Sequence, residues 1–406
     1  MNKAVRRKIR QRLIEHFPPH TVTFIFSGLS IRKSADANYP FHVNRNFLYA
    51  TGIEEEAAIL VFDNGNEILF LRDVDPAMEK WNGHYMRIEE AQEISGIKDV
   101  RYFEGFEAYL EKILSRKTRI GLDLDQNHFS ETAYGSAVSM ADYVGIERVI
   151  DVTEIFVRSR MLKFPEEVEA IKHAAVISDI AIKSMLHEMK PGNNENDMAS
   201  KFLYEAHKHQ GGLMFDTIIA SGKEATVLHY IENNQELKDG ELVLMDLGVC
   251  VNGYGADISL TYPVNGTYSP RQKEVYEVVL ETYEAVIAAI RPGVSLLELN
   301  ELAKEKLAQG CRTLGLIKSN DEIDRYYYHS IGHSLGLDTH DVWTSRDFPL
   351  EAGNVITVEP GLYIEEESIG IRIETDILVT ETGSEDLAPQ TLKGVEEVEA
   401  YLKSIQ

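Results

Sequence analysis

The stretch LVLMDLGVCVNGYGADISLTYPV, residues 242–264, begins like a buried β-strand and then places two carboxylates, Asp246 and Asp257, among apolar residues. An ionised carboxylate that is buried costs several kcal/mol unless it is paired, hydrogen-bonded or bound to a cation. The nearest basic residues in the sequence, Lys238 and Arg271, lie outside the stretch. The two aspartates therefore need a neutralising partner from elsewhere.

The strand around Asp246 has a counterpart later in the chain. GELVLMDLG, residues 240–248, aligns without a gap to GNVITVEPG, residues 353–361, so that Asp246 falls on Glu359. The strand regions that follow add one acid each, Asp257 in GADISLTYPV and Glu374 in RIETDILVT. A solvent-facing strand position would explain any one of these acids, but it does not explain four at duplicated positions.

Two predicted helices precede each of these strand regions. In the first half a long helix opens at Pro165, ends before Pro191-Gly192 and is followed by DMASKFLYEAHKHQGG. In the second half QKEVYEVVLETYEAVIAAIRPG is followed by LLELNELAKEKLAQG. Such a duplication predicts two halves related by an approximate twofold axis, which gather the four acids in one curved antiparallel sheet flanked by helices.

The residues before this duplication predict a separate domain, because 406 residues exceed what one hydrophobic core usually serves. We predict strands at TVTFIFSG, at FLYATGI, at RIGLDLD, and in a hairpin formed by AAILVF and EILFLRD. Helical segments lie between them. The fold class is therefore α/β (α+β), with a small mixed α/β amino-terminal domain over 1–155 and a second domain, which holds the duplicated sheet, over 156–406.

The composition limits the partners of the chain. The formal charge of −25, from 41 basic and 66 acidic residues, disfavours nucleic acid and anionic membrane surfaces, and it favours cations. Only two cysteines occur, Cys250 and Cys311, and no apolar run approaches the length of a membrane span. These features predict a cytoplasmic protein with no nucleic acid and no membrane partner.

Histidines gather between the two pairs of acids. The segment YYYHSIGHSLGLDTHDVW contains His329, His333 and His340, three of the 13 histidines of the chain. A single histidine is usually structural, but this cluster favours a functional site. His229 precedes Asp246 by seventeen residues and His340 precedes Glu359 by nineteen, so the duplication pairs His229 with His340 across the site.

Four carboxylates and one imidazole, with no thiolate, favour hard or borderline divalent cations. Four acids are more than one ion requires, so two ions are the economical number. Two such ions that share a water molecule lower its pKa toward neutrality, which predicts hydrolytic chemistry.

The motifs MDLG, GADIS, HSIGH, VEPGLY and GIRIETD, in this order and spacing, resemble the aminopeptidase P and prolidase branch of the pita-bread metallopeptidases. SIRKSADANYPFHVNRNFLYATGI resembles the amino-terminal domain of aminopeptidase P. The resemblance implies two divalent metal ions, manganese first, with zinc, cobalt or iron as alternatives. It also implies that Asp257 and Glu374 bridge both ions and that Glu359 is the general base. The implied metal ligands are Asp246, Asp257, His333, Glu359 and Glu374.

The same resemblance implies further roles around the metal ligands. The catalytic set contains Arg372 and three pocket histidines, His229, His329 and His340, and an imidazole there would stabilise an oxyanion or pass a proton to the leaving nitrogen. The chain departs from the usual pattern at Ser330 and Trp343, where glycines are common, so details of the pocket differ. The implied substrate-binding residues are Tyr363, Asp36 and Trp81.

Three residues of the amino-terminal domain and junction carry the weakest part of this resemblance. Asp36, Trp81 and Arg160 resemble residues that shape the cleft. Each has an equally simple structural interpretation: a surface acid for Asp36, a packed aromatic for Trp81 and a surface ion pair for Arg160.

The predicted function is hydrolysis of the bond between an amino-terminal residue and a penultimate proline. The alternatives are a prolidase, restricted to Xaa-Pro dipeptides, and a non-catalytic binding protein of the same fold. The predicted partner is a peptide with a penultimate proline, and we expect a homo-oligomer, either a dimer or a tetramer.

Overall fold

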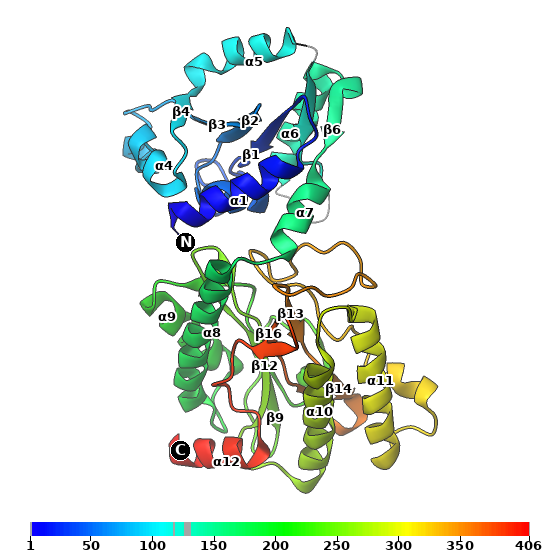
Figure 1. Cartoon of the computed structure of the whole chain (residues 1–406). Coiled ribbons are helices and arrows are strands. Elements are labelled where there is room, and N and C mark those ends of the chain that lie inside the picture. Colours follow the sequence, from blue (N-terminus) through cyan, green and yellow to red (C-terminus); the bar gives the residue numbers. More distant parts are fainter. Residues whose placement is uncertain (1, 117, 126–130, 406) are drawn as a thin grey trace. The chain divides into compact units, whose positions relative to one another are not determined.

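The computed structural model describes residues 2–116, 118–125 and 131–405. The chain divides into two compact units, Met1–Arg160 and Met161–Gln406 (Figure 1). Helix α7 (Thr153–Met161) runs through the boundary predicted at residue 155, and the division falls at the end of this helix. No helix among the described residues combines the length and the apolar character that crossing a membrane requires.

The first unit is built on a mixed six-stranded sheet, which agrees with the predicted α/β character. The strand order is β4-β3-β2-β1-β5-β6, and β2 pairs antiparallel with both β1 and β3, whereas the other neighbours are parallel. The predicted hairpin is confirmed as β2 and β3. The strands are β1 (Thr21–Phe26), β2 (Ile59–Asp63), β3 (Asn66–Leu71), β4 (Asp99–Tyr102), β5 (Arg119–Leu122) and β6 (Val149–Asp151). The main helices are α1 (Lys3–His16), α4 (Ile88–Ser95), α5 (Phe106–Leu114) and α6 (Glu131–Val144).

The prediction of a strand at FLYATGI is wrong, because these residues form helix α2 (Arg45–Thr51) and its end. The side chain of Asn44 caps the helix by accepting a hydrogen bond from the backbone N–H of Phe47. Gly52 closes it with φ 74° and donates its N–H to the carbonyl of Leu48 at 2.7 Å. Caps at both ends outweigh the strand preference of an aromatic apolar run.

The second unit contains short antiparallel sheets flanked by two helix pairs (Figure 1). The first half holds α8 (Pro165–Met185), α9 (Glu195–Lys208), β7 (Gly212–Leu213), β8 (Ile218–Ser221), β9 (Leu242–Leu247), β10 (Val249–Val251), β11 (Tyr254–Gly255) and β12 (Ile258–Pro263). The second half holds α10 (Pro270–Ala289), α11 (Leu296–Thr313), β13 (Val355–Val358), β14 (Gly361–Ile364), β15 (Ile369–Arg372), β16 (Thr375–Val379), β17 (Ser384–Asp386) and α12 (Val395–Ile405). The predicted helix pairs are therefore confirmed.

Matching backbone hydrogen bonds support the internal duplication. In the first half Gly192 donates its N–H to Leu237 at 2.9 Å, and in the second half Gly293 donates to Leu350 at 2.8 Å. The helices that follow, α9 and α11, begin at equivalent positions, directly after these two glycine turns. Each glycine turn thus leads into the second helix of the pair in its own half.

The two halves join directly at the strands that carry the acids. Strand β9 pairs with β12, and β13 pairs with β16, both antiparallel. Across the halves, the N–H of Glu374 donates to the carbonyl of Ser259 at 2.8 Å, and the N–H of Arg372 donates to the hydroxyl of Thr261 at 3.1 Å. Residues that are more than a hundred positions apart are thereby held at hydrogen-bonding distance.

Candidate metal centre

Five predicted ligand positions converge from both halves of the second unit. Asp246 lies in β9 opposite Ser259, and Asp257 immediately precedes β12. The other three positions are Glu359 directly after β13, Glu374 between β15 and β16, and His333 in the loop before β13. Strand ends and loops supply these side chains, so they meet at the junction of the halves.

A close approach of two backbones makes the turn between the aspartates possible. A Cβ atom on Gly248 would lie 1.8 Å from the carbonyl oxygen of Ala256, so only glycine fits there. The residues between them form the small strands β10 and β11, which pair with each other. The chain then returns as β12, which pairs antiparallel with β9.

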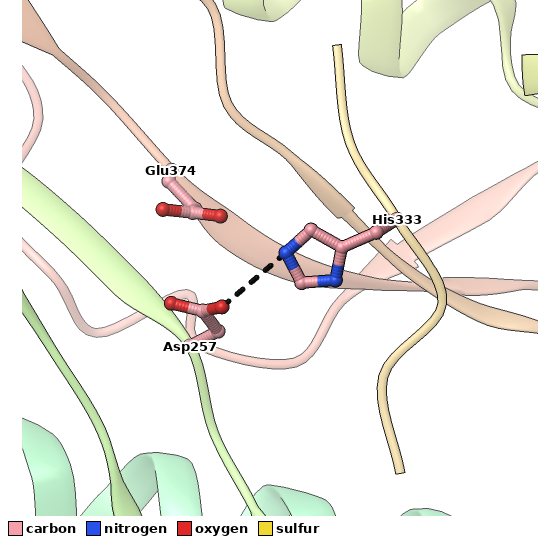
Figure 2. Close-up of side chains that lie close together, drawn as sticks. All are labelled: Asp257, His333 and Glu374. Carbon is pink, nitrogen blue, oxygen red and sulfur yellow. Dashed lines mark ion pairs between the residues drawn. The ribbon is translucent and has the colours of Figure 1, made fainter. Parts of the chain in front are cut away.

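Asp257, His333 and Glu374 form the tightest group, with one donor atom from each within 4.8 Å of the other two (Figure 2). The Nε2 atom of His333 lies 3.5 Å from Oδ2 of Asp257 and 3.6 Å from Oε1 of Glu359. Figure 2 shows the imidazole edge of His333 turned toward the carboxylates of Asp257 and Glu374. The geometry offers a mixed oxygen and nitrogen donor set for one divalent cation, with two further acids beside it.

The electrostatics of the cluster show an excess of negative charge. Burial, opposed by Arg372, raises the pKa of Asp246 to about 6, and burial also raises the pKa of Glu359 to about 7. Burial and the neighbouring carboxylates raise the pKa of Glu374 well above its usual range. Burial opposes the charged form of His333, but Asp257 and Glu359 outweigh it and raise the pKa of the imidazole to about 9. The acids are therefore packed more closely than the local positive charge can balance.

Two observations test whether a metal ion fits this cluster. The carbonyl of Ser334 can only accept a hydrogen bond, so Nδ1 of His333, 3.1 Å away, carries the proton. In the neutral ring this directs the lone pair of Nε2 at the carboxylates, as in metal-ligating histidines. Moreover, Oδ1 of Asp246 is buried and accepts no hydrogen bond from the described residues. A divalent cation would replace the proton that the imidazole otherwise carries on Nε2 and would contact Oδ1 of Asp246, so the residues fit a metal ion.

Arg372 supplies a positive charge that the sequence around Asp246 does not reveal. Its guanidinium is buried and donates to Asp246 Oδ2 at 2.5 Å, to Ser259 Oγ at 2.8 Å and to the hydroxyl of Tyr363 at 3.0 Å. Ser259 in turn donates to Glu374 at 2.6 Å. Part of the neutralising charge that Asp246 needs therefore comes from Arg372, in the other half of the second unit.

His329 lies beside the cluster with both ring nitrogens engaged. Nδ1 donates to the carbonyl of Ser330 at 2.8 Å, and Nε2 lies 2.8 Å from the hydroxyl of Tyr363. Burial, reinforced by the charge of Arg372, lowers the pKa of His329 to about 4. A neutral ring whose two nitrogens are occupied orients Tyr363 and is poorly placed to donate to a substrate. Tyr363 is itself buried, and its contact with substrate stays a prediction.

The cluster opens into a cavity of about 910 Å³, large enough for a short peptide. The side chains of His229 and His340 are exposed at this cavity, and the rings of His340 and His333 lie 4.2 Å apart. The structure thus brings the two paired histidines into one cavity with the acids. Several residues that line the cavity were not predicted from the sequence, because no periodicity or spacing distinguishes them. These residues are Phe215, Asp216, Ile218, Leu228, Ile231, Thr339 and Arg346.

The three residues that were predicted to shape the cleft, Asp36, Trp81 and Arg160, lie in the first unit. Asp36 is exposed, and Trp81 is 83% exposed, so its interpretation as a packed aromatic is wrong. Arg160 is buried and donates to the side-chain oxygen of Asn46 at 2.9 Å, which corrects the surface ion pair. A role in substrate binding stays a prediction for Asp36 and Trp81.

Comparison with known proteins agrees with this arrangement. Residues 169–381 match the model of metallopeptidase family M24, and residues 6–121 match the aminopeptidase P amino-terminal domain. The Xaa-Pro aminopeptidase of Escherichia coli K12 is 33% identical, with 97% of this chain and 96% of the relative covered.

Solved structures give the same result at the level of the fold. A putative aminopeptidase P from Bacillus anthracis is 41% identical with a TM-score of 0.94, covering 100% of this chain and 99% of that one. Aminopeptidase P from E. coli with the inhibitor Pro-Leu is 31% identical with a TM-score of 0.91 and the same coverage. These similarities span both units and confirm the predicted pita-bread fold. The chain belongs to metallopeptidase family M24.

Proposed function

We propose that this chain is a metal-dependent Xaa-Pro aminopeptidase, which releases an amino-terminal residue from a peptide whose second residue is proline. The observation that carries the proposal is the cluster of Asp257, His333 and Glu374 at the base of a peptide-sized cavity. The full-length similarity to Xaa-Pro aminopeptidases supports it.

The residues divide the work of hydrolysis between them. Asp246, Asp257, His333, Glu359 and Glu374 would hold the metal, which when bound would supply an activated water and a Lewis acid for the carbonyl group of the scissile bond. Glu359, which lies beside His333 in the cavity, accepts the proton of the attacking water. His229 and His340, exposed in the cavity, donate to the developing oxyanion or to the leaving nitrogen.

Arg372 and Tyr363 fix the positions of Asp246 and His329 by hydrogen bonds. The guanidinium of Arg372 fixes Asp246, and the hydroxyl of Tyr363 connects Arg372 to His329. Such buried hydrogen bonds hold the catalytic groups in a fixed geometry.

Several finer features belong to the same proposal. We propose two manganese ions per chain, because four carboxylates and one imidazole suit hard or borderline cations and exceed the needs of one ion. We also propose a homo-oligomeric, cytoplasmic enzyme, with amino-terminal and catalytic domains meeting near residue 155.

A panel of four peptides tests the function with manganese added to purified protein. We expect cleavage of Ala-Pro-Ala at the first bond, little cleavage of Ala-Ala-Ala and none of acetyl-Ala-Pro-Ala. Hydrolysis of the dipeptide Ala-Pro alone would assign a prolidase instead. Absence of cleavage together with absence of bound metal would assign a binding protein.

A further inference from the structure

The segment that carries His229 has little regular structure of its own. It leaves β8 at Ser221, forms one short 3-10 helix over Gly222–Thr226 and continues without a helix or strand until β9 begins at Leu242. Because the His229 side chain is exposed in the cavity, packing of that side chain alone cannot fix its position. The position must be fixed by the backbone on either side.

Glu195, at the start of α9, holds this segment at three points. Its Oε1 accepts hydrogen bonds from the N–H of Ser221 at 2.7 Å and from the hydroxyl of Ser221 at 2.6 Å. Its Oε2 accepts from the hydroxyl of Tyr230 at 2.8 Å and from the N–H of Gln235 at 2.9 Å. One carboxylate thus joins the beginning of the segment, the immediate neighbour of His229 and the part beyond it.

The environment of Glu195 suits a charged carboxylate without a basic partner. The side chain is fully buried, and no described Lys, Arg or His forms an ion pair with it. Four hydrogen bonds from N–H and O–H groups and a position in the first turn of α9 favour the negative charge instead. Hydrogen bonds to a charged acceptor are stronger than neutral ones, and they have defined directions.

Further hydrogen bonds tie the residues around His229 to each other and to neighbouring elements. The hydroxyl of Tyr230 also accepts the N–H of Asn234 at 3.2 Å, while the carbonyl of Gln235 accepts the N–H of Glu195 at 3.0 Å. The side chain of Asn233, with φ 47°, accepts from Ile219 and donates to Thr217, both at 2.7 Å. His229 therefore lies between two anchors, Ser221 and Tyr230, that share one acceptor.

The internal duplication provides a built-in comparison. Asn194 caps α9 and Ser295 caps α11, so Glu195 and Leu296 occupy the same first position of equivalent helices. Leu296 is a buried apolar residue, and α11 begins normally with it. Starting the helix and packing it therefore do not need a carboxylate here. The acid is specific to the half whose following segment carries His229.

From this arrangement we infer that Glu195 is a positioning residue for His229, acting through Ser221 and Tyr230 on the histidine that faces the peptide. The inference rests on the proposed function, in which His229 donates to the substrate. Glu195 itself lies outside the cavity lining and does not contact the metal ligands through any hydrogen bond of the described residues.

Kinetics of single and double variants test the inference in the manganese-loaded protein. Glu195→Gln keeps the shape, but its amide nitrogen faces two donors, so the segment loosens and kcat should fall about 10- to 100-fold with bound metal unchanged. In a His229→Ala background the same substitution should have little further effect. Equal losses of kcat in both backgrounds would refute the positioning role, as would an unchanged kcat in Glu195→Gln.

A matched control lies on the same helix. Glu205 is also a buried acid of α9, but it bonds to Ser184 at 3.2 Å and Lys208 at 3.1 Å, away from the His229 segment. Glu205→Gln should therefore leave kcat unchanged. A second variant, Glu195→Leu, copies the other half and should lower kcat at least as much as Glu195→Gln.

Hydrogen–deuterium exchange separates this inference from the proposed function, because it needs no turnover. Exchange in residues 222–235 should rise in Glu195→Gln and stay at the wild-type level in Glu205→Gln. If wild-type protein lacks peptidase activity, the proposed function fails, and exchange still decides whether Glu195 holds the segment. Unchanged exchange in Glu195→Gln would overturn the inference.

Discussion

Replacing Glu374 by glutamine should make the metal-free protein more stable and the metal-loaded protein less stable. Glu374 is buried among three other acids, and it accepts a hydrogen bond from the hydroxyl of Ser259 at 2.6 Å. Glutamine has nearly the same shape, and its carbonyl oxygen can keep this hydrogen bond. The substitution therefore removes charge and leaves packing almost unchanged.

The size of the effect follows from the cost of keeping this carboxyl protonated. Its pKa in the metal-free fold is raised well above the ordinary value of 4.5, by burial first and by neighbouring carboxylates next. Each pH unit between 4.5 and the working pH costs the folded state about 1.36 kcal/mol, so the penalty at pH 7 is at most about 3.4 kcal/mol. For a unit of this size, the gain corresponds to a rise in Tm of up to roughly 7 to 14 °C.

The sign of the pH dependence is defined in the same way. In metal-free wild type the folded state holds a proton on Glu374 that the unfolded state has released, so the contribution of this group to stability is fully present below pH 4.5 and is lost as pH rises toward the folded pKa. Glutamine has no such proton. The gain in Glu374→Gln should therefore grow between pH 5 and pH 7.

Thermal unfolding followed by circular dichroism measures both states, once with EDTA and once with excess manganese. Glu381 is exposed and follows the end of β16, so Glu381→Gln gives the control variant. This substitution should leave Tm unchanged both with EDTA and with manganese. In manganese the order should reverse, because wild type gains binding energy that the variant lacks. A metal-free Glu374→Gln protein that unfolds below wild type would refute this reasoning.

Three further predictions concern metal and substrate. Asp257→Ala should abolish activity and reduce bound metal while circular dichroism shows the fold retained; full activity would exclude a bridging ligand at this position. His340→Ala should lower kcat about 10²- to 10³-fold with metal content by elemental analysis near wild type, and loss of metal instead would make His340 a ligand. Replacing the penultimate proline of a tripeptide by alanine should greatly reduce its cleavage, as followed by chromatography, because proline offers a fixed ring and no N–H; equal rates would reject proline specificity.

The fold of the second unit could be predicted well from the sequence, because the duplication repeats each of its sequence patterns. Asp246 alone is ambiguous, but its alignment with Glu359 and the repeated helix pairs give the same answer twice. The four acids and His333 do meet in space. Such repetition lets one half serve as a check on the other.

Contacts between distant residues set the limit of prediction. Arg372 reaches Asp246 across 126 positions, and Glu195 reaches Tyr230 across 35, without any periodic signal. The strand predicted at FLYATGI failed for a different reason, because the caps Asn44 and Gly52 determined the local conformation more strongly than the aromatic apolar run. The long-range contacts leave no local signal in the sequence, whereas the two cap residues are a local signal that was given too little weight.

The division of the donor set between two halves of one chain has a consequence for how such a site can change. A symmetric homodimer would have to carry every substitution twice, once in each copy. When both halves belong to one chain, each half is always close to the other at a high effective concentration. Assembly of the site therefore does not depend on protein concentration. It also allows the halves to diverge independently, which is visible where one has Asp246 and Glu195 and the other has Glu359 and Leu296. Asymmetry of this kind is useful to an enzyme whose substrate, a peptide, has two different ends.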